Sequence, residues 1–267
     1  MPRLRVSAIS FLNTAPLMWD FDHGDLRRRY QVDYTLPSTC AEMLRQDAAD
    51  IGIIPVAAYA TIPDLVVVPD IAIAARGAVK SILLISKAPV EKIRIVGTDT
   101  SSRTSVALLE VLLRKFHGVS AELRPMEPRL QPMLKECDAG LLIGDPALLA
   151  KTDGYHVYDL AAEWKRFTSK PFVFAFWAVR RAVASADVVR DFQQSRDNGL
   201  RPENLDATAR EWAVRLGMLE TEILSYLKDN IHFYLDEDCL DGLRLFYEHA
   251  AEVGVLPKAP TVEFVGI

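Results

Sequence analysis

The amino-acid sequence predicts an α/β protein of two lobes, a clamshell with two hinge strands and a helical C-terminal layer. Short β-branched runs alternate with helical patterns through the first two thirds of the 267 residues, which is typical of βαβ units. Two long apolar strands, Val79 to Ile85 and Phe172 to Val179, bracket a middle segment with a βαβ pattern of its own. From Ala186 to Val253 the periodicity is helical. The chain therefore leaves one α/β lobe, builds a second and returns.

The first third predicts five strands, which favour a parallel sheet with helices on both faces. The strands are expected at Leu4–Ile9, Val32–Leu36, Ile51–Ile54, Leu65–Val68 and Ile71–Ala75. Leu17 to Phe21 and Val56 to Ile62 are expected to be helical, the second with Pro55 in its first turn.

The middle and last thirds continue the pattern. Further strands are expected at Ile93–Val96, Ala121–Arg124 and Ala139–Ile143, with a helix over Val106–Lys115. The C-terminal helices should break near Asn198-Gly199, Gly217 and Asp229-Asn230. Their inward-facing residues are predicted to be Trp212, Leu216, Ile223, Leu227, Leu243, Phe246 and Tyr247.

This organisation predicts one lobe from residues 1–86 and 178–267 and a second, inserted lobe from residues 87–177. Ligands of open α/β sheets bind at the carboxyl ends of the strands. We therefore expect a small-molecule site where the strand ends of the two lobes face a cleft.

Composition narrows the function further. The formal net charge is −5 and the only dense basic cluster is Arg27 to Arg29, so nucleic acid is not an expected partner. No apolar run reaches the length of a membrane span, and three separated cysteines fit reduced thiols in a cytoplasm. Neither a nucleotide-binding glycine motif nor a familiar metal-ligand spacing occurs. We expect a cytoplasmic protein that binds a small molecule, without membrane, metal or cofactor.

The first polar cluster follows the first strand, at Ser10 to Pro16. Asn13 offers a carbonyl and an amide NH₂ group, so its side chain can orient a hydroxyl group of a ligand. The alternative is that Asn13 or Thr14 caps a helix.

The second polar cluster, Thr98 to Ser105, offers six hydroxyl groups and one guanidinium at the start of a helix. Unpaired N–H groups and the helix dipole favour an anion there, more in keeping with a small carboxylate than with a polyphosphate. The alternative is capping by Ser102 together with Ser105.

Two further residues lie at strand ends. Asp145, in Gly144-Asp145-Pro146, can cap its helix, accept a hydrogen bond from a ligand or accept a proton. Ser81 lies on a hinge strand shortly after Gly77. The alternating rings Phe172, Phe174 and Phe176 are expected to be core, and one or two of them could wall a cleft.

Five blocks of residues, in this order, resemble the menaquinone-biosynthesis family MqnA. The resemblance extends over most of the chain from Val6 to Val179, and the blocks are Ile9–Leu17, Gly52–Val56, Ser101–Ser105, Leu141–Leu148 and Pro171–Ala175. It implies a type II periplasmic-binding-protein-like fold. It also implies chorismate dehydratase activity, a hydro-lyase reaction that gives 3-[(1-carboxyvinyl)oxy]benzoate in the futalosine route to menaquinone.

The resemblance also implies roles for individual residues. Asn13 and Ser81 would be nearest the chemistry, with Asn13 orienting the departing C4 hydroxyl group. Substrate-binding roles would fall to Ser10, Thr14, Ser101, Ser102, Thr104, Ser105 and Asp145. The enolpyruvyl carboxylate of the substrate could itself accept the C3 proton, which would explain why no catalytic His or Glu is evident.

Three alternatives stay open at this point. The same fold serves non-catalytic solute-binding proteins, a dihydroxynaphthoate synthase of the same pathway and the effector domains of transcription regulators. The missing signal peptide argues against a periplasmic receptor, and the Phe11-Leu12-Asn13-Thr14 block favours the dehydratase. The sequence leaves open whether the protein forms a homodimer.

Overall fold

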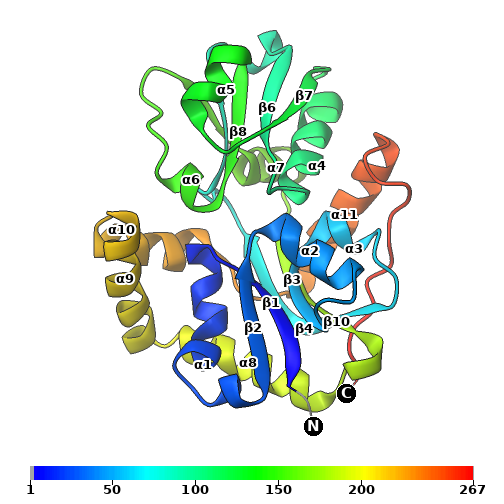
Figure 1. Ribbon diagram of the computed structural model, residues 1–267. Coiled ribbons are helices and arrows are strands. Elements are labelled where there is room, and N and C mark those ends of the chain that lie inside the picture. The colour runs from blue at the N-terminus through cyan, green and yellow to red at the C-terminus, as the bar shows by residue number, and fades with distance from the viewer. Residues whose placement is uncertain (1–2, 267) are drawn as a thin grey trace. The chain divides into compact units, whose positions relative to one another are not determined.

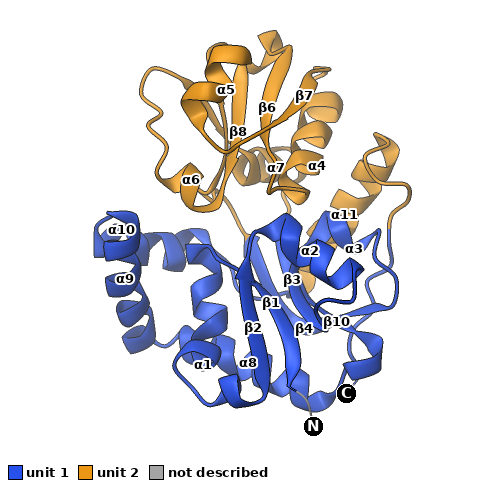
Figure 2. Ribbon diagram, viewed as in Figure 1, with its two compact units in different colours: residues 1–74, 173–236, 260–267 blue, residues 75–172, 237–259 orange. Residues whose placement is uncertain are grey.

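The structure, a computed structural model that describes residues 3–266, contains two five-stranded sheets, each in its own unit (Figure 1). Unit 1 comprises Met1–Ala74, Val173–Asp236 and Pro260–Ile267, and unit 2 comprises Ala75–Phe172 and Glu237–Ala259 (Figure 2). The predicted α/β class is confirmed.

Unit 1 is built on a mixed sheet with the strand order β2-β1-β3-β10-β4. Strand β1 is parallel to β2 and β3, whereas β10 returns antiparallel to β3. The predicted parallel pairing is confirmed for β1, β2 and β3, whereas β10, the strand that re-enters this unit, runs in the opposite direction. The strands are β1 (Leu4–Ile9), β2 (Tyr30–Thr35), β3 (Ile51–Pro55), β4 (Leu65–Ala75) and β10 (Phe172–Arg180).

Strand β4 is one continuous strand rather than the two that Pro69 and Asp70 predicted. Asp70 adopts a φ of 64°, a left-handed conformation that Asp tolerates better than most residues. The chain thus bends locally at Asp70 without leaving the sheet. The side chain of Arg196 on α8 contacts both the backbone oxygen and the carboxylate of Asp70, which stabilises the bend.

Helices of unit 1 follow the predicted breaks. They are η1 (Leu12–Met18), α1 (Trp19–Asp22), η2 (Leu26–Arg28), α2 (Pro37–Arg45), α3 (Val56–Tyr59), η5 (Arg181–Val183), α8 (Ala186–Gly199), α9 (Pro202–Leu216), α10 (Glu220–Ser225) and η6 (Tyr226–Asn230). Helix α9 begins with Pro202 and ends at Gly217, whose φ of 66° is the left-handed conformation that terminates helices.

The core of unit 1 is aromatic where α8 packs on the sheet. The Phe192 ring centroid lies 4.7 Å from that of Trp177 and 4.9 Å from that of Phe21. The Tyr30 hydroxyl group donates to the Asp191 carboxylate over 2.8 Å, so the one acidic group at this buried contact is paired. This packing fixes α8 against the sheet, and α8 in turn contacts η1.

Unit 2 holds a second mixed sheet with the strand order β7-β6-β8-β5-β9. Strand β6 is parallel to β7 and β8, and β5 is antiparallel to β8 and β9. The strands are β5 (Ile82–Ser86), β6 (Ile95–Asp99), β7 (Glu122–Met126), β8 (Ala139–Ile143) and β9 (His156–Asp159). The helices are η3 (Val90–Lys92), α4 (Thr104–Val111), η4 (Leu112–Phe116), α5 (Leu130–Glu136), α6 (Gly144–Leu148), α7 (Leu160–Thr168) and α11 (Glu237–Glu252).

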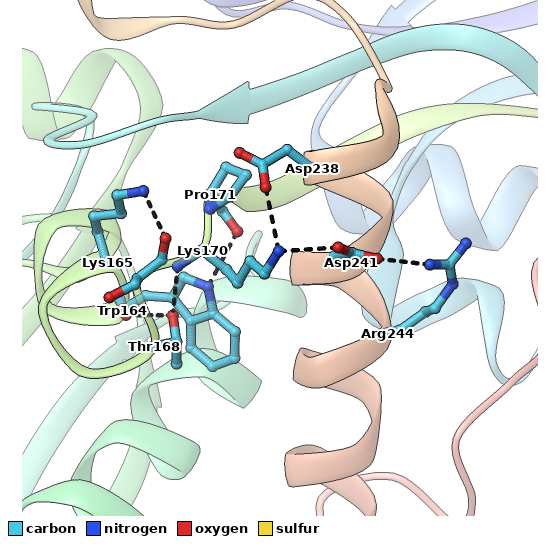
Figure 3. A network of polar contacts seen from close by, with 9 residues as sticks. Trp164, Lys165, Thr168, Lys170, Pro171, Asp238, Asp241 and Arg244 are labelled. Carbon is cyan, nitrogen blue, oxygen red and sulfur yellow. Dashed lines mark hydrogen bonds and ion pairs between the residues drawn. The ribbon is translucent and has the colours of Figure 1, made fainter.

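Helix α11 belongs to unit 2, although it comes from the helical tail of the sequence. Its Phe246 ring lies 5.0 Å from Phe172, and its Gly242 lies against the backbone of Pro171. Lys170 forms ion pairs with Asp238 and Asp241 on the first turns of α11, as Figure 3 shows. A close backbone contact and two ion pairs therefore join α11 to the segment after α7.

The units differ from the expected lobes in two places. The chain passes between units at residues 74/75 and 172/173 rather than near 86 and 178, because β5 pairs with β8 and β9 of the second sheet. Residues 237–259 lie in unit 2 rather than with the other C-terminal helices. None of the three cysteines forms a disulfide in the part of the chain that the structure describes.

Candidate functional site

The loop after β1 carries the first group of predicted site residues, all in unit 1. The Ser10 N–H donates to the Thr35 carbonyl oxygen over 2.9 Å, which extends the β1–β2 pairing by one residue. Helix η1 begins at Leu12 with Phe11 before it, and no side chain caps it in residues 3–266. Capping by Asn13 or Thr14 is therefore wrong.

Asn13 keeps its amide donors available. Its carbonyl oxygen accepts a 3.4 Å hydrogen bond from the buried Thr14 hydroxyl group, and its NH₂ group has no partner among the described residues. Asn13 itself is half-buried. Thr14 thus orients the Asn13 amide, which can still donate to a ligand oxygen.

Helix α8 packs against this loop and fixes its position. The Ser195 hydroxyl group donates to the Leu17 carbonyl oxygen over 2.9 Å and accepts from the Asp20 N–H over 3.0 Å. Gly199 lies so close to Pro16 that an added Cβ would be 1.8 Å from the Pro16 carbonyl oxygen. The position of η1 is therefore fixed by backbone contacts that tolerate no added atoms at Gly199.

A cavity of about 310 Å³ adjoins the same loop within unit 1. Ser10 and Phe11 line it, whereas Asn13 and Thr14 do not. The other lining residues come from β1, η1, α1 with the residue after it, β2 and α9. They are Ile9, Ala15, Met18, Asp22, His23, Tyr34, Thr208, Glu211, Trp212 and Arg215.

Arg215 places a guanidinium group at this cavity. Its carbon lies 4.2 Å from the Trp212 ring centroid, and one of its nitrogens donates to the Ser10 hydroxyl oxygen over 3.0 Å. A guanidinium held by stacking presents its remaining donors in a fixed plane, which suits a carboxylate. No local pattern indicates this role of Arg215, because the residue lies 205 positions after Ser10 in the chain.

Acceptor groups occupy another part of the cavity. The Tyr34 hydroxyl group donates to the Asp22 carboxylate over 2.5 Å. Burial raises the pKa of Asp22, and the negative charge of Glu211 raises it further, whereas the bond from Tyr34 lowers it. This cavity therefore offers both a cationic group and hydrogen-bond acceptors.

In unit 2, the remaining predicted site residues gather at one edge of the sheet. Strands β6 and β8 end at this edge, and the antiparallel strand β5 begins there. The Gly144 N–H donates to the Ser81 carbonyl oxygen over 2.8 Å, which joins the residue before β5 to the residue after β8. Ser81 is fully buried and Asp145 is half-buried.

Helix α6 begins at Gly144, whose φ is 60°, and the described residues provide no side-chain cap for it. Capping of this helix by Asp145 is therefore wrong.

The loop from Thr98 to Ser105 differs from expectation in its exposure. Strand β6 extends through Thr98 to Asp99, and helix α4 begins at Thr104. Four of the six hydroxyl residues are buried, and Ser102 is half-buried; the buried ones are Thr98, Ser101, Thr104 and Ser105. The cluster thus offers fewer open hydroxyl groups than the sequence suggested.

The start of α4 also differs from the prediction. Arg103 precedes the helix, and no side chain in residues 3–266 caps it, so capping by Ser102 with Ser105 is wrong. The N–H of Ala107, bonded to the Arg103 carbonyl oxygen over 3.1 Å, starts the helical ladder. Backbone N–H groups before Ala107 lack an acceptor within the helix, as at every helix start, and such groups favour an anion.

The predicted site residues thus form two groups, one in each unit. Ser10, Asn13 and Thr14 follow β1 in unit 1. The unit 2 group comprises Ser81, Ser101, Ser102, Thr104, Ser105 and Asp145. Within each unit, the residues lie at the edge where the parallel strands end, which is where α/β sheets bind ligands.

Comparison with known proteins decides the family. Residues 4–252 match the sequence profile of a family described as "Menaquinone biosynthesis". The chain belongs to this family. Its match to a chorismate dehydratase from Thermus thermophilus has 30% identity and covers 94% of each chain.

Solved structures of relatives share the fold of this family member. Protein AF1704 from Archaeoglobus fulgidus has a TM-score of 0.75 at 17% identity, with 95% of this chain and 98% of that chain covered. The periplasmic aliphatic sulphonate binding protein SsuA from Escherichia coli has a TM-score of 0.67 at 16% identity, with coverage of 100% and 95%. The predicted periplasmic-binding-protein-like fold is thereby confirmed. Among the described residues, every helix is too short or too polar to cross a membrane.

Proposed function

We propose that this protein is a chorismate dehydratase, a hydro-lyase that converts chorismate into 3-[(1-carboxyvinyl)oxy]benzoate and water. The observation that carries the proposal is the 30% identity to a chorismate dehydratase, which extends over 94% of both chains. The family match over residues 4–252 supports the same assignment.

The reaction needs little from the protein beyond positioning and charge stabilisation. Loss of the C3 proton and of the C4 hydroxyl group leaves an aromatic ring, and no electrons are gained or lost overall. The C3 proton is vinylogous to the ring carboxylate, so negative charge spreads onto that carboxylate as the proton leaves. Donors directed at the carboxylate stabilise this transition state.

The residues of unit 1 suit the hydroxyl end of the substrate. In this proposal the Asn13 amide donates to the C4 oxygen and orients it for departure, because its NH₂ group has no partner among the described residues. Thr14 orients that amide, and Ser10 binds the substrate nearby. Arg215, which donates to Ser10, adds a cation that a dianionic substrate requires.

The residues of unit 2 suit a carboxylate. The uncapped start of α4 supplies backbone N–H groups, and Ser102, Thr104 and Ser105 shape it. Ser81 and Asp145 lie at the same sheet edge, where Ser81 assists the departing group and Asp145 accepts a hydrogen bond. The enolpyruvyl carboxylate of the substrate accepts the C3 proton.

Incubation of the purified protein with chorismate tests the proposal. Absorbance and mass spectrometry should show an aromatic product that has lost one water and retains the enolpyruvyl group. Chorismate that binds, as measured by calorimetry, but is recovered unchanged would show instead a solute-binding protein of the same fold. Chorismate that neither binds nor reacts would contradict both functions.

A further inference from the structure

Asp99, the last residue of β6, is hydrogen-bonded to two residues of the loop before α4, Ser101 and Ser102. One of its carboxylate oxygens, Oδ1, accepts a hydrogen bond from the Ser101 N–H over 2.8 Å and another from the Ser101 hydroxyl group over 2.6 Å. The Ser102 N–H donates to the Asp99 backbone oxygen over 3.0 Å. Three bonds therefore tie the loop to a single residue.

The contacts change the role of Ser101. Ser101 is buried and donates its hydroxyl hydrogen to Asp99, so that hydrogen is not available to a ligand. A buried carboxyl oxygen that accepts a backbone N–H and a side-chain hydroxyl group two residues later stabilises a tight turn. Ser101 is thus part of the internal support of the loop.

The second carboxylate oxygen of Asp99 is different. Oδ2 is buried and has no hydrogen-bond partner at normal distance among the described residues, although the Ile143 N–H of β8 faces the Asp99 carboxylate and stabilises its charged form. Burial raises the pKa of Asp99, while the bonds from Ser101 lower it. An amide NH₂ group in place of Oδ2 has nearly the same size and carries no charge, but it places two donors in a buried position that has no acceptor, which costs stability.

We propose that Asp99 is a positioning residue: through Oδ1 it holds residues 100–103 in the turn that leaves the start of α4 open to a substrate carboxylate. The inference rests on the proposed function, since it names what supports the carboxylate-binding residues of unit 2. Asp99 acts through Ser101 and the backbone, and its negative charge is not required.

Two substitutions of Asp99 distinguish the hydrogen bonds that Oδ1 accepts from the negative charge of the carboxylate. Asp99→Asn retains an oxygen that accepts both bonds from Ser101 and replaces Oδ2 by an NH₂ group. Its Tm should fall because the buried NH₂ group lacks an acceptor, whereas KM for chorismate should stay within about threefold of wild type. Asp99→Ala removes the acceptor and lets the loop move, so KM should rise by about tenfold or more, with a smaller change in kcat. The pH dependence of kcat/KM in Asp99→Asn should match that of wild type.

Asp138→Ala is the matched control. Its carboxylate accepts the N–H groups of Arg94 and Ile95 over 2.9 and 3.0 Å, at the opposite end of the same sheet. This variant also loses a carboxylate that supports the backbone, so its Tm should fall while KM remains near the wild-type value.

Two results would overturn the proposal: an Asp99→Asn variant as impaired as Asp99→Ala, or an Asp99→Ala variant with wild-type KM. If Asp99→Ala fails to fold, Ser101→Ala replaces it and should raise KM by about threefold or more, through loss of one of the two bonds. Wild-type protein that does not convert chorismate contradicts the proposed function alone. Calorimetry with benzoate as the carboxylate probe then tests Asp99 separately, with the same ranking of variants expected.

Discussion

Replacing Gly199 by alanine tests how firmly α8 holds the loop that carries Asn13. The new Cβ would lie 1.8 Å from the Pro16 carbonyl oxygen and 2.7 Å from the carbonyl carbon, whereas such contacts are essentially never shorter than 3.0 Å. Both obstructing atoms belong to the backbone, so no side-chain rotation relieves the contact. Either α8 or η1 must move by at least about 1.2 Å.

This displacement has two measurable consequences. Overpacking of a well-packed contact destabilises a protein by about 1–3 kcal/mol, and we expect Gly199→Ala to lower the free energy of unfolding by this amount. A misplacement of about 1 Å in catalytic groups lowers rates by about a hundredfold. Because η1 carries Asn13, kcat/KM for chorismate should fall by about ten- to a hundredfold.

Gly242→Ala provides the comparison for Gly199→Ala. Its Cβ would lie 2.2 Å from the Pro171 carbonyl oxygen, a similar contact made within unit 2. Urea denaturation should show a loss of stability in both variants, with the larger loss of kcat/KM in Gly199→Ala. Wild-type stability and activity in Gly199→Ala would refute the reasoning, since it would mean that the close contact with Pro16 is unimportant.

Three further predictions concern stability, pH and binding. Ser195→Ala removes the partner of the half-buried Asp20 N–H and of the buried Leu17 carbonyl, so urea denaturation should show a loss of about 1–3 kcal/mol. Hydrogen bonding to Arg5 holds the pKa of Asp50 below its ordinary value, so the ionised carboxylate stabilises the folded protein. This contribution to the free energy of unfolding is present above the unfolded-state pKa of Asp50 and is lost as the pH falls through the folded-state pKa. Urea midpoints of Asp50→Asn should therefore change less than those of wild type between about pH 5 and pH 2. Arg215→Gln should raise KM by about tenfold with kcat little changed, whereas Arg210→Gln, a change on the same helix outside the cavity, should leave both constants unchanged.

The sequence was most informative where strands end in polar residues. Ser10 and Asn13 follow β1, and Asp145 follows β8, as the apolar runs before them predicted. The change from an apolar run to polar residues is a local signal, and it correctly placed both groups at sheet edges. It did not show which side chains are buried, because burial depends on the helices packed above.

Two residues show what local patterns miss. Arg215 contacts Ser10 because of the way α9 packs within unit 1, which no local pattern predicts. The spacing of Thr208, Trp212 and Arg215 does indicate that these three residues lie on one face of α9, and all three line the cavity. The sequence places Asp99 in a polar loop, but β6 extends to it and its carboxylate is buried. A carboxylate two residues before a serine can form a turn, and the sequence alone does not show whether it does so.

The placement of α11 needed long-range information as well. Its amphipathic pattern predicted a helix with Leu243, Phe246 and Tyr247 inside, and all three are buried. The pattern is the same whichever sheet the helix packs against. Its assignment to unit 2 depends on contacts with the segment after α7, among them the ion pairs of Lys170.

Turnover of chorismate by wild type and Asn13→Ala, measured side by side, tests the central claim most directly. We predict that wild type forms 3-[(1-carboxyvinyl)oxy]benzoate and water. Asn13→Ala should keep the wild-type Tm and bind chorismate with an affinity within about tenfold of wild type, yet lose kcat by about a hundredfold or more. An Asn13→Ala variant that turns over at the wild-type rate would contradict the role of Asn13, and a wild-type protein that leaves chorismate unchanged would contradict the dehydratase assignment itself.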